Sequence, residues 1–149
     1  MLRQILLGGG TNIVNIAVHA LLMTTVVRVA QSVESMSKSR SSLLLVVVLI
    51  PTVTVLMITH TIEVFVWAGA YAIVDAVPAE PFGDLVYFAF VNYTTLGYGD
   101  IIPTPRWRLL GPMTAMNGVL LFGWSTAVIF EVLRKALARI EISRGGRRR

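Results

Sequence analysis

The sequence predicts an all-α membrane protein, with three membrane-spanning helices and one shorter, re-entrant helix followed by a glycine-containing loop. Its composition is the first reason, because 55% of the 149 residues are hydrophobic and only 14% are charged. The second reason is length, since a helix needs about 20 apolar residues to cross a hydrocarbon core about 30 Å thick. The apolar segments that reach this length are Ile5 to Val27, Leu43 to Tyr71 and Leu109 to Leu133.

The first segment begins like a secretory signal peptide, because Arg3 precedes an apolar run. We expect it to remain as a helix, since Arg28 lies three residues before the nearest cut site, where cleavage requires a small residue. Residues 1–30 then form an extra amino-terminal transmembrane helix. Residues 31–42 are serine-rich with charges of both signs, which predicts a solvated linker.

The second segment contains Pro51, which removes one backbone hydrogen bond and predicts a kink. Trp67 and Tyr71 near its far end, with Trp107 before the third segment, indicate an aromatic belt at the membrane surface. This belt places Glu63 about one helical turn inside the apolar region.

The segment Asp84 to Thr94 is apolar but too short to span, and it predicts a re-entrant helix. The loop after it reads Thr94-Thr95-Leu96-Gly97-Tyr98-Gly99-Asp100. Successive carbonyl groups point the same way only if alternate residues adopt backbone conformations that glycine visits at little cost, which explains Gly97 and Gly99. Rings of such carbonyls, supplied by several chains, replace the hydration shell of a cation.

This loop resembles the selectivity-filter signature of the tetrameric potassium channels. The resemblance extends over Pro81 to Pro103 and, with the flanking helices, covers about the last two-thirds of the chain. Leu96 departs from the Val or Ile of many relatives, and Tyr87 and Phe88 stand where many have two tryptophans. The resemblance implies the potassium-channel pore fold, in a small prokaryotic-type homotetramer that conducts K⁺ passively. Residues 43–137 are then the pore module, and residues 138–149 a basic cytoplasmic tail.

The resemblance also implies the roles of individual residues. The carbonyls of Thr95, Leu96, Gly97 and Tyr98 would bind K⁺ within the filter Thr95 to Gly99. Tyr98 would wedge against the surrounding helices, Asp100 would lie at the outer mouth, Tyr87 would reach Asp100 with its hydroxyl, and Phe88 would only pack. The residues expected to support the filter are Thr94, Asp100, Tyr87 and Phe88. We expect no cofactor besides K⁺ as the permeant ion.

The third segment carries small residues that allow either a bend or close helix packing, and the sequence leaves both open at Gly118 and Gly123. One face of this helix is expected to line an inner cavity, and its members are Met116, Leu120, Gly123 and Ala127. Asn117 lies beside that face, and we expect it to bond a neighbouring backbone group.

His60 and Glu63 are three residues apart and share one helix face. We favour a polar pair satisfied by Thr11, Asn12 or Asn15 of the first helix over a proton sensor, with metal binding the least favoured alternative. His19 is the only other histidine. Counting helical rise from opposite membrane faces predicts that His19 and His60 are about 15 Å apart and share no ion.

Charge predicts the orientation, because positively charged loops remain cytoplasmic. Lys38 and Arg40 lie between the first two spans, and the tail carries Arg144 and Arg147 to Arg149. The carboxyl terminus is then cytoplasmic and the amino terminus outside, in a multi-pass protein of the cell membrane. The net charge of +5 fits anionic lipid near the tail rather than nucleic acid.

Two alternatives to a potassium channel remain: a potassium transporter subunit, and a non-conducting membrane assembly or regulatory subunit. The sequence contains no nucleophile with a base partner, phosphate-binding loop or metal cluster, and we expect no enzymatic activity.

Overall fold

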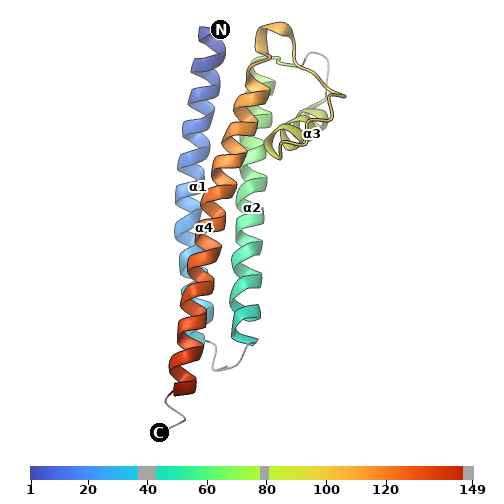
Figure 1. Ribbon diagram of the computed structural model, residues 1–149. Helices are drawn as coiled ribbons and strands as arrows, with labels where there is room; N and C mark the ends of the chain where they lie inside the picture. The colour runs from blue at the N-terminus through green and yellow to red at the C-terminus, as the bar shows by residue number, and fades with distance from the viewer. Residues whose placement is uncertain (37–42, 78–80, 146–149) are drawn as a thin grey trace. The chain divides into compact units, whose positions relative to one another are not determined.

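A computed structural model describes residues 1–36, 43–77 and 81–145 (Figure 1). Its elements are α1 (Leu2–Met36), α2 (Leu43–Ile73), α3 (Phe82–Tyr93), a 3₁₀ turn η1 (Pro105–Trp107) and α4 (Leu110–Gly145). All regular structure in the described residues is helical, and three helical segments are long and apolar enough to cross a membrane. The predicted all-α membrane fold is therefore confirmed.

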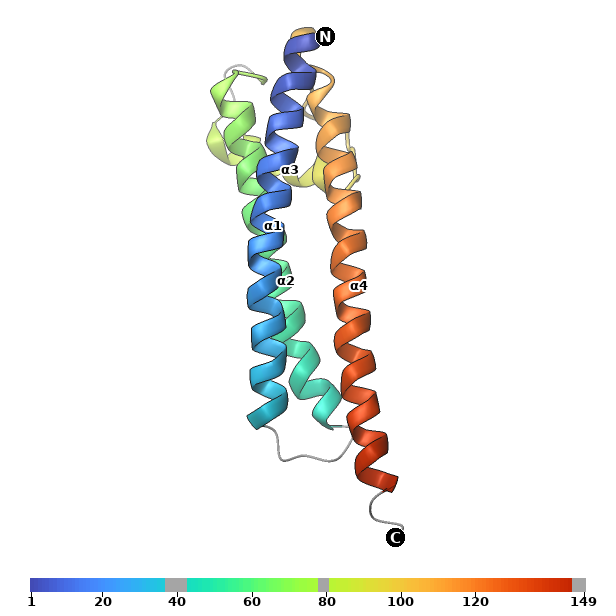
Figure 2. The same ribbon diagram turned by 90° about the vertical axis from the view of Figure 1, so that its left-hand side faces the viewer.

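The segments that are long and apolar enough to span a membrane are Leu2–Arg28, Leu45–Ile73 and Pro105–Glu141, and they include nearly all of the predicted apolar stretches. α1 and α4 continue past the ends of these segments, to Met36 and Gly145, because polar residues at a helix end need not interrupt backbone hydrogen bonding. Figure 2 shows α1, α2 and α4 as the long helices and α3 as the short one. The short helix begins at Phe82 and ends at Tyr93, close to the predicted Asp84 to Thr94.

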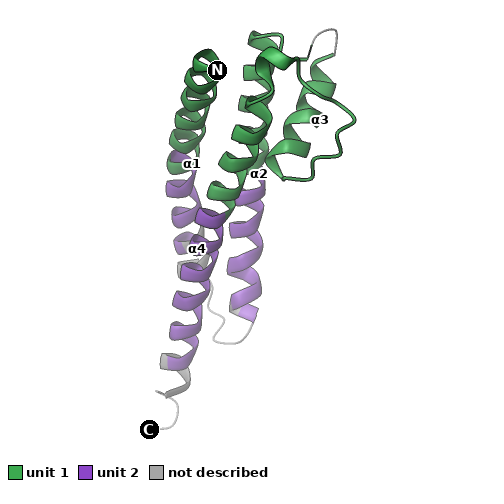
Figure 3. Ribbon diagram, turned by 45° about the horizontal axis from the view of Figure 1, so that its top comes forward, with its two compact units in different colours: residues 1–20, 59–122 green, residues 21–58, 123–149 purple. Residues whose placement is uncertain are grey.

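Contacts between backbone positions divide the chain into two compact units (Figure 3). The first contains residues 1–20 and 59–122, and the second contains residues 21–58 and 123–149. Each unit thus contains segments of α1, α2 and α4. The predicted domains 1–30, 31–42, 43–137 and 138–149 instead follow the order of the chain. That division stays a prediction. Of the predicted linker and tail, residues 37–42 and 146–149 lie outside the described residues, as does the side chain of Arg144.

The core of the first unit is aromatic. Trp67, Tyr71 and Tyr93 are almost completely buried, and the ring of Tyr71 lies 4.9 Å from that of Phe88, between centroids. The predicted aromatic belt is therefore wrong for Trp67 and Tyr71, because α3 and its neighbours cover the end of α2 that carries them. Trp107 is also buried, at 8% exposure.

The amino terminus of α1 lies beside the segment that leads into α4. The side-chain oxygen of Gln4 accepts a hydrogen bond of 2.9 Å from the backbone N–H of Leu109. A free N–H at a helix start is costly away from water, so this bond stabilises the beginning of α4. Met1 to Gln4 also line a shallow pocket with Arg106 and Trp107.

The second unit has two smaller apolar clusters. Met23, Val26 and Leu56 form one, and Val48 and Ile140 form the other. α2 continues through Pro51 as one helix, and the hydroxyl of Thr52 donates to the carbonyl of Val48 at 2.8 Å. This hydroxyl bonds the carbonyl four residues before it and does not replace the bond to Val47 that Pro51 cannot make.

Candidate functional site

The loop after α3 is fastened to the carboxyl end of that helix. The N–H groups of Leu96 and Gly97 both donate to the carbonyl of Val91, at 2.9 and 3.2 Å. The N–H of Thr95 donates to Asn92 at 2.9 Å. Because the first loop donors bond carbonyls that a helix otherwise leaves unpaired, α3 fixes where the loop begins.

The backbone of the loop alternates in handedness. Thr95, Gly97 and Gly99 have positive φ values of 61°, 58° and 75°, whereas Leu96 and Tyr98 do not. Such alternation turns the carbonyls of successive residues toward one side, the arrangement that rings of ion-binding carbonyls require. The two glycines accept this conformation at little cost, but Thr95 is a β-branched residue in a region that such residues rarely occupy.

Two side chains of the loop remain uncovered within one chain. Leu96 is 54% exposed and Tyr98 is 66% exposed. Tyr98 was expected to wedge against the surrounding helices, and the helices of its own chain do not cover it. Large exposed apolar side chains at membrane depth indicate contact with lipid or with further protein.

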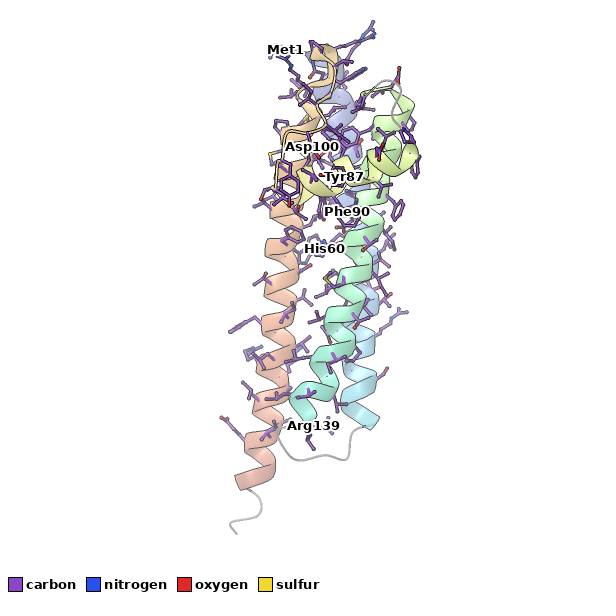
Figure 4. The ribbon with its side chains drawn as sticks, turned by 90° about the vertical axis from the view of Figure 1, so that its right-hand side faces the viewer. Met1, His60, Tyr87, Phe90, Asp100 and Arg139 are labelled. Atoms are coloured by element: carbon purple, nitrogen blue, oxygen red, sulfur yellow. The ribbon has the colours of Figure 1, made fainter. Side chains whose placement is uncertain are left out.

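Tyr87 and Asp100 link α3 to the outer end of the loop, and Figure 4 labels both. The hydroxyl of Tyr87 donates to a carboxylate oxygen of Asp100 at 2.5 Å. This bond stabilises the charged carboxylate and lowers the pKa of Asp100. Phe88 is 4% exposed and packs in the core, and the Thr94 hydroxyl donates to the Phe90 carbonyl at 2.8 Å.

The two glycines of α4 differ in their surroundings. A Cβ atom at Gly118 would lie 2.0 Å from the backbone oxygen of Tyr93, whereas a Cβ at Gly123 would meet no atom within 4 Å. Close packing against the end of α3 is therefore the observed role of Gly118. Hinging at Gly118 or Gly123 stays a prediction. The predicted cavity-lining residues Met116, Leu120, Gly123 and Ala127 are all exposed in the single chain.

A polar cluster is buried behind the loop, around the carboxylate of Glu63. The Nδ1 atom of His19 lies 2.7 Å from one carboxylate oxygen, and Nδ1 of His60 lies 2.9 Å from the other. The hydroxyl of Tyr93, the last residue of α3, donates to the same oxygen as His60. His19 and Glu63 are completely buried.

The expected separation of about 15 Å between His19 and His60 is therefore wrong, since their ring centroids are 5.5 Å apart. Within the predicted apolar stretches, His19 lies 14 residues after Ile5 and His60 lies 11 residues before Tyr71. At 1.5 Å of rise per residue, their depths differ by only about 4.5 Å, so the expected separation does not follow from those stretches. The role of His60 and Glu63 as a proton sensor stays a prediction.

The first helix contributes a second set of buried contacts. The amide nitrogen of Asn15 donates to the backbone oxygen of Glu63 at 3.2 Å and to the side-chain oxygen of Asn117 at 2.8 Å. Trp67 donates to the same oxygen of Asn117 at 3.0 Å. Asn15 was among the partners predicted for this region. Asn117, expected to bond a backbone group, accepts from these two side chains instead.

Sequence reasoning missed His19 and Tyr93 as members of the Glu63 cluster. The signal for His19 was its spacing, because Asn12, Asn15 and His19 recur at helical intervals in an apolar segment and so mark one polar helix face. Tyr93 gave no comparable signal, since an aromatic residue at the end of a short apolar helix is ordinary core composition.

The fold defines an integral membrane protein in which the short helix α3 and its loop lie between two candidate spans in the chain. A family model described as "Ion channel" matches residues 43–135, which is more than half of the chain. The chain therefore belongs to the ion channel family, whose members conduct ions passively. Comparisons with curated proteins and with solved structures found no match.

Proposed function

We propose that this chain forms a homotetrameric channel that conducts K⁺ selectively through the loop Thr95 to Gly99. The observation that carries this proposal is the alternation of positive φ at Thr95, Gly97 and Gly99. It supports a stack of carbonyl rings from Thr95 to Tyr98, in which backbone oxygens replace the water around K⁺.

One chain supplies only one loop, so a closed ring of oxygens requires several chains around an axis. Four copies are proposed from the resemblance of the loop to the filters of tetrameric potassium channels. The exposure of Leu96 and Tyr98 supports an assembly in which neighbouring chains cover them. The exposed face of Met116, Leu120, Gly123 and Ala127 would then line the inner cavity.

α3 contributes to ion passage electrostatically. A helix dipole carries about half a negative charge at its carboxyl end, which here is Tyr93. Four such ends directed at a central cavity would stabilise a partly hydrated cation below the filter. Asp100 at the other end of the loop, whose charged form is stabilised by the Tyr87 hydroxyl, would concentrate cations at the entrance.

The proposed setting is the cell membrane, with the amino terminus outside and the carboxyl terminus cytoplasmic. The position of Gln4 beside Leu109 supports an amino terminus on the side of the loop that follows the filter. Anionic lipids are proposed as partners of the basic tail, and K⁺ is the only proposed ligand of the filter.

The test is the reversal potential of the purified protein in planar bilayers under opposed potassium and sodium gradients. We expect the wild type to reverse near the potassium equilibrium potential. Tyr98→Asp should move the reversal potential toward zero, because it loosens the outer rings. Gly99→Ala should abolish current, because a side chain disfavours φ of 75°.

Robust wild-type current that reverses near zero would contradict potassium selectivity. Tetramers without current would favour a non-conducting assembly. Potassium uptake that requires a second subunit would favour a transporter. Leu96→Val serves as the matched control, since the residue contributes only its carbonyl, and it should keep the wild-type reversal potential.

A further inference from the structure

We propose that His19, His60 and Glu63 form a binding site for a divalent transition-metal cation, with zinc as the best-fitting ion. This site uses none of the loop residues Thr95 to Gly99, and its three side chains come from the extra helix α1 and from α2. It requires no assumption about potassium selectivity.

The three side chains converge from two helices that are distant in sequence. Each offers one ligand atom, and these atoms all lie within 4.8 Å of one another. Two imidazoles and one carboxylate are a ligand set that zinc uses in proteins, where a fourth position is filled by another group or by water. The oxygen of Tyr93, 3.0 Å from Nδ1 of His60, is placed to fill that position.

The distances allow a metal with a small adjustment. In a tetrahedral zinc site with bonds of about 2.0–2.1 Å, neighbouring ligand atoms are about 3.3 Å apart. The observed N–O separations are 2.7 Å from His19 and 2.9 Å from His60, each to a different oxygen of Glu63, and one ligand atom from each residue fits within 4.8 Å. Metal binding would require the short separations to widen by roughly half an ångström and the longer ones to close toward about 3.3 Å.

Charge also favours a cation here. Glu63 is completely buried, and both of its described ion-pair partners are histidines, which are neutral unless protonated. A carboxylate among neutral groups is costly at membrane depth, so the site gains from a bound positive charge. Imidazole nitrogen selects zinc, copper or nickel over magnesium, calcium and potassium, which prefer oxygen ligands.

A metal bound here would join α1 to α2 beside the end of α3. His19 belongs to α1, His60 and Glu63 belong to α2, and Tyr93 ends α3 two residues before Thr95. The metal would thus attach the extra amino-terminal helix to the element that positions the conducting loop.

The experiment uses the full-length protein in detergent, stripped with a chelator and titrated with Co²⁺ and then Zn²⁺. We expect one metal per chain by elemental analysis, and a cobalt absorption spectrum typical of tetrahedral coordination that zinc abolishes. His19→Gln and His60→Gln should each weaken binding by at least about tenfold, a loss that even outer-shell changes reach. Thr11→Val is the matched control, because its hydroxyl bonds Leu7 within α1 and lies outside the cluster.

Wild-type protein that takes up no stoichiometric metal would overturn the proposal, whatever the variants do. Equal affinity in His19→Gln and Thr11→Val would overturn it too, since binding would then be elsewhere. An octahedral cobalt spectrum would indicate water or carboxylate ligands on the surface and would also exclude this site. The wild-type measurement does not depend on the folding of any variant.

Discussion

Gly118 is the residue at which packing is least tolerant of change. An added Cβ would lie 2.0 Å from the Tyr93 carbonyl oxygen, which is a backbone atom, and the position of a Cβ is itself fixed by the backbone, so neither can rotate away. We expect Gly118→Ala to lower the apparent melting temperature of the purified protein, because overpacking costs about 1–3 kcal/mol. This cost exceeds the gain of about 1 kcal/mol that alanine brings to a helix interior.

Gly123→Ala is the control for that measurement, since its Cβ would enter open space. It should melt at or above the wild-type temperature. Equal melting temperatures of the two variants would mean that Gly118 does not approach Tyr93 closely. A hinge would then be the better explanation for a glycine at this position.

Single residues also mark the limit of sequence reasoning. The need for Gly97 and Gly99 followed from the carbonyl geometry, and both have positive φ. Thr95 shares that conformation although its side chain disfavours it, so no residue preference could have indicated it. The depth of His19 was miscounted, because the rise from Ile5 to His19 and the rise from Tyr71 to His60 differ by only about 4.5 Å.

At the scale of elements, the hydrogen bond between Tyr87 of α3 and Asp100 links the helix to the far end of the loop, which is the proposed outer end of the filter. We expect Tyr87→Phe to keep current but to make it decay faster during sustained depolarisation, because Asp100 at the far end of the loop loses its hydrogen bond to α3. The measurement is the fraction of current remaining at the end of a long voltage step.

The matched control is Phe90→Leu, which changes an aromatic residue on the same helix that makes no bond to the loop through its side chain. Unchanged decay in Tyr87→Phe would mean that Asp100 is held by other groups in the assembled channel.

The long helices were predictable from the sequence because each one is indicated by the hydropathy of many residues, so no single residue decides the outcome. Hydropathy over more than 20 residues identifies a span whatever its exact ends. The short helix was predictable because the loop motif fixes where it must stop. The burial of Trp67 and Tyr71 was not, since the same aromatic residues serve at a membrane surface and in a core, and only the position of α3 distinguishes the two.

For the whole molecule, the testable property is its orientation in the membrane. The chain has no cysteine, so single introduced cysteines can be labelled without background. Leu2→Cys and Ile102→Cys, at positions 70% and 71% exposed, should react with a membrane-impermeant maleimide on intact cells. Arg149→Cys should react only after permeabilisation, because basic segments remain cytoplasmic.

Labelling of Leu2→Cys and Arg149→Cys from the same side would refute three spans. Labelling of Arg149→Cys alone on intact cells would keep three spans but invert the orientation. Ile102→Cys then serves as the internal reference, because the filter must have its Asp100 end outward if Asp100 is to attract external cations.

The contact between Gly118 and the end of α3 means that a movement of α4 is transmitted to the loop that follows α3. Tyr93, whose carbonyl rests against α4, is followed by only one residue before the loop turns to positive φ at Thr95. A displacement of α4 at this level would therefore also move the residues that lead into the loop. In the proposed channel, a stimulus that tilts α4 would thus change the shape of the filter as well as the width of the inner pore.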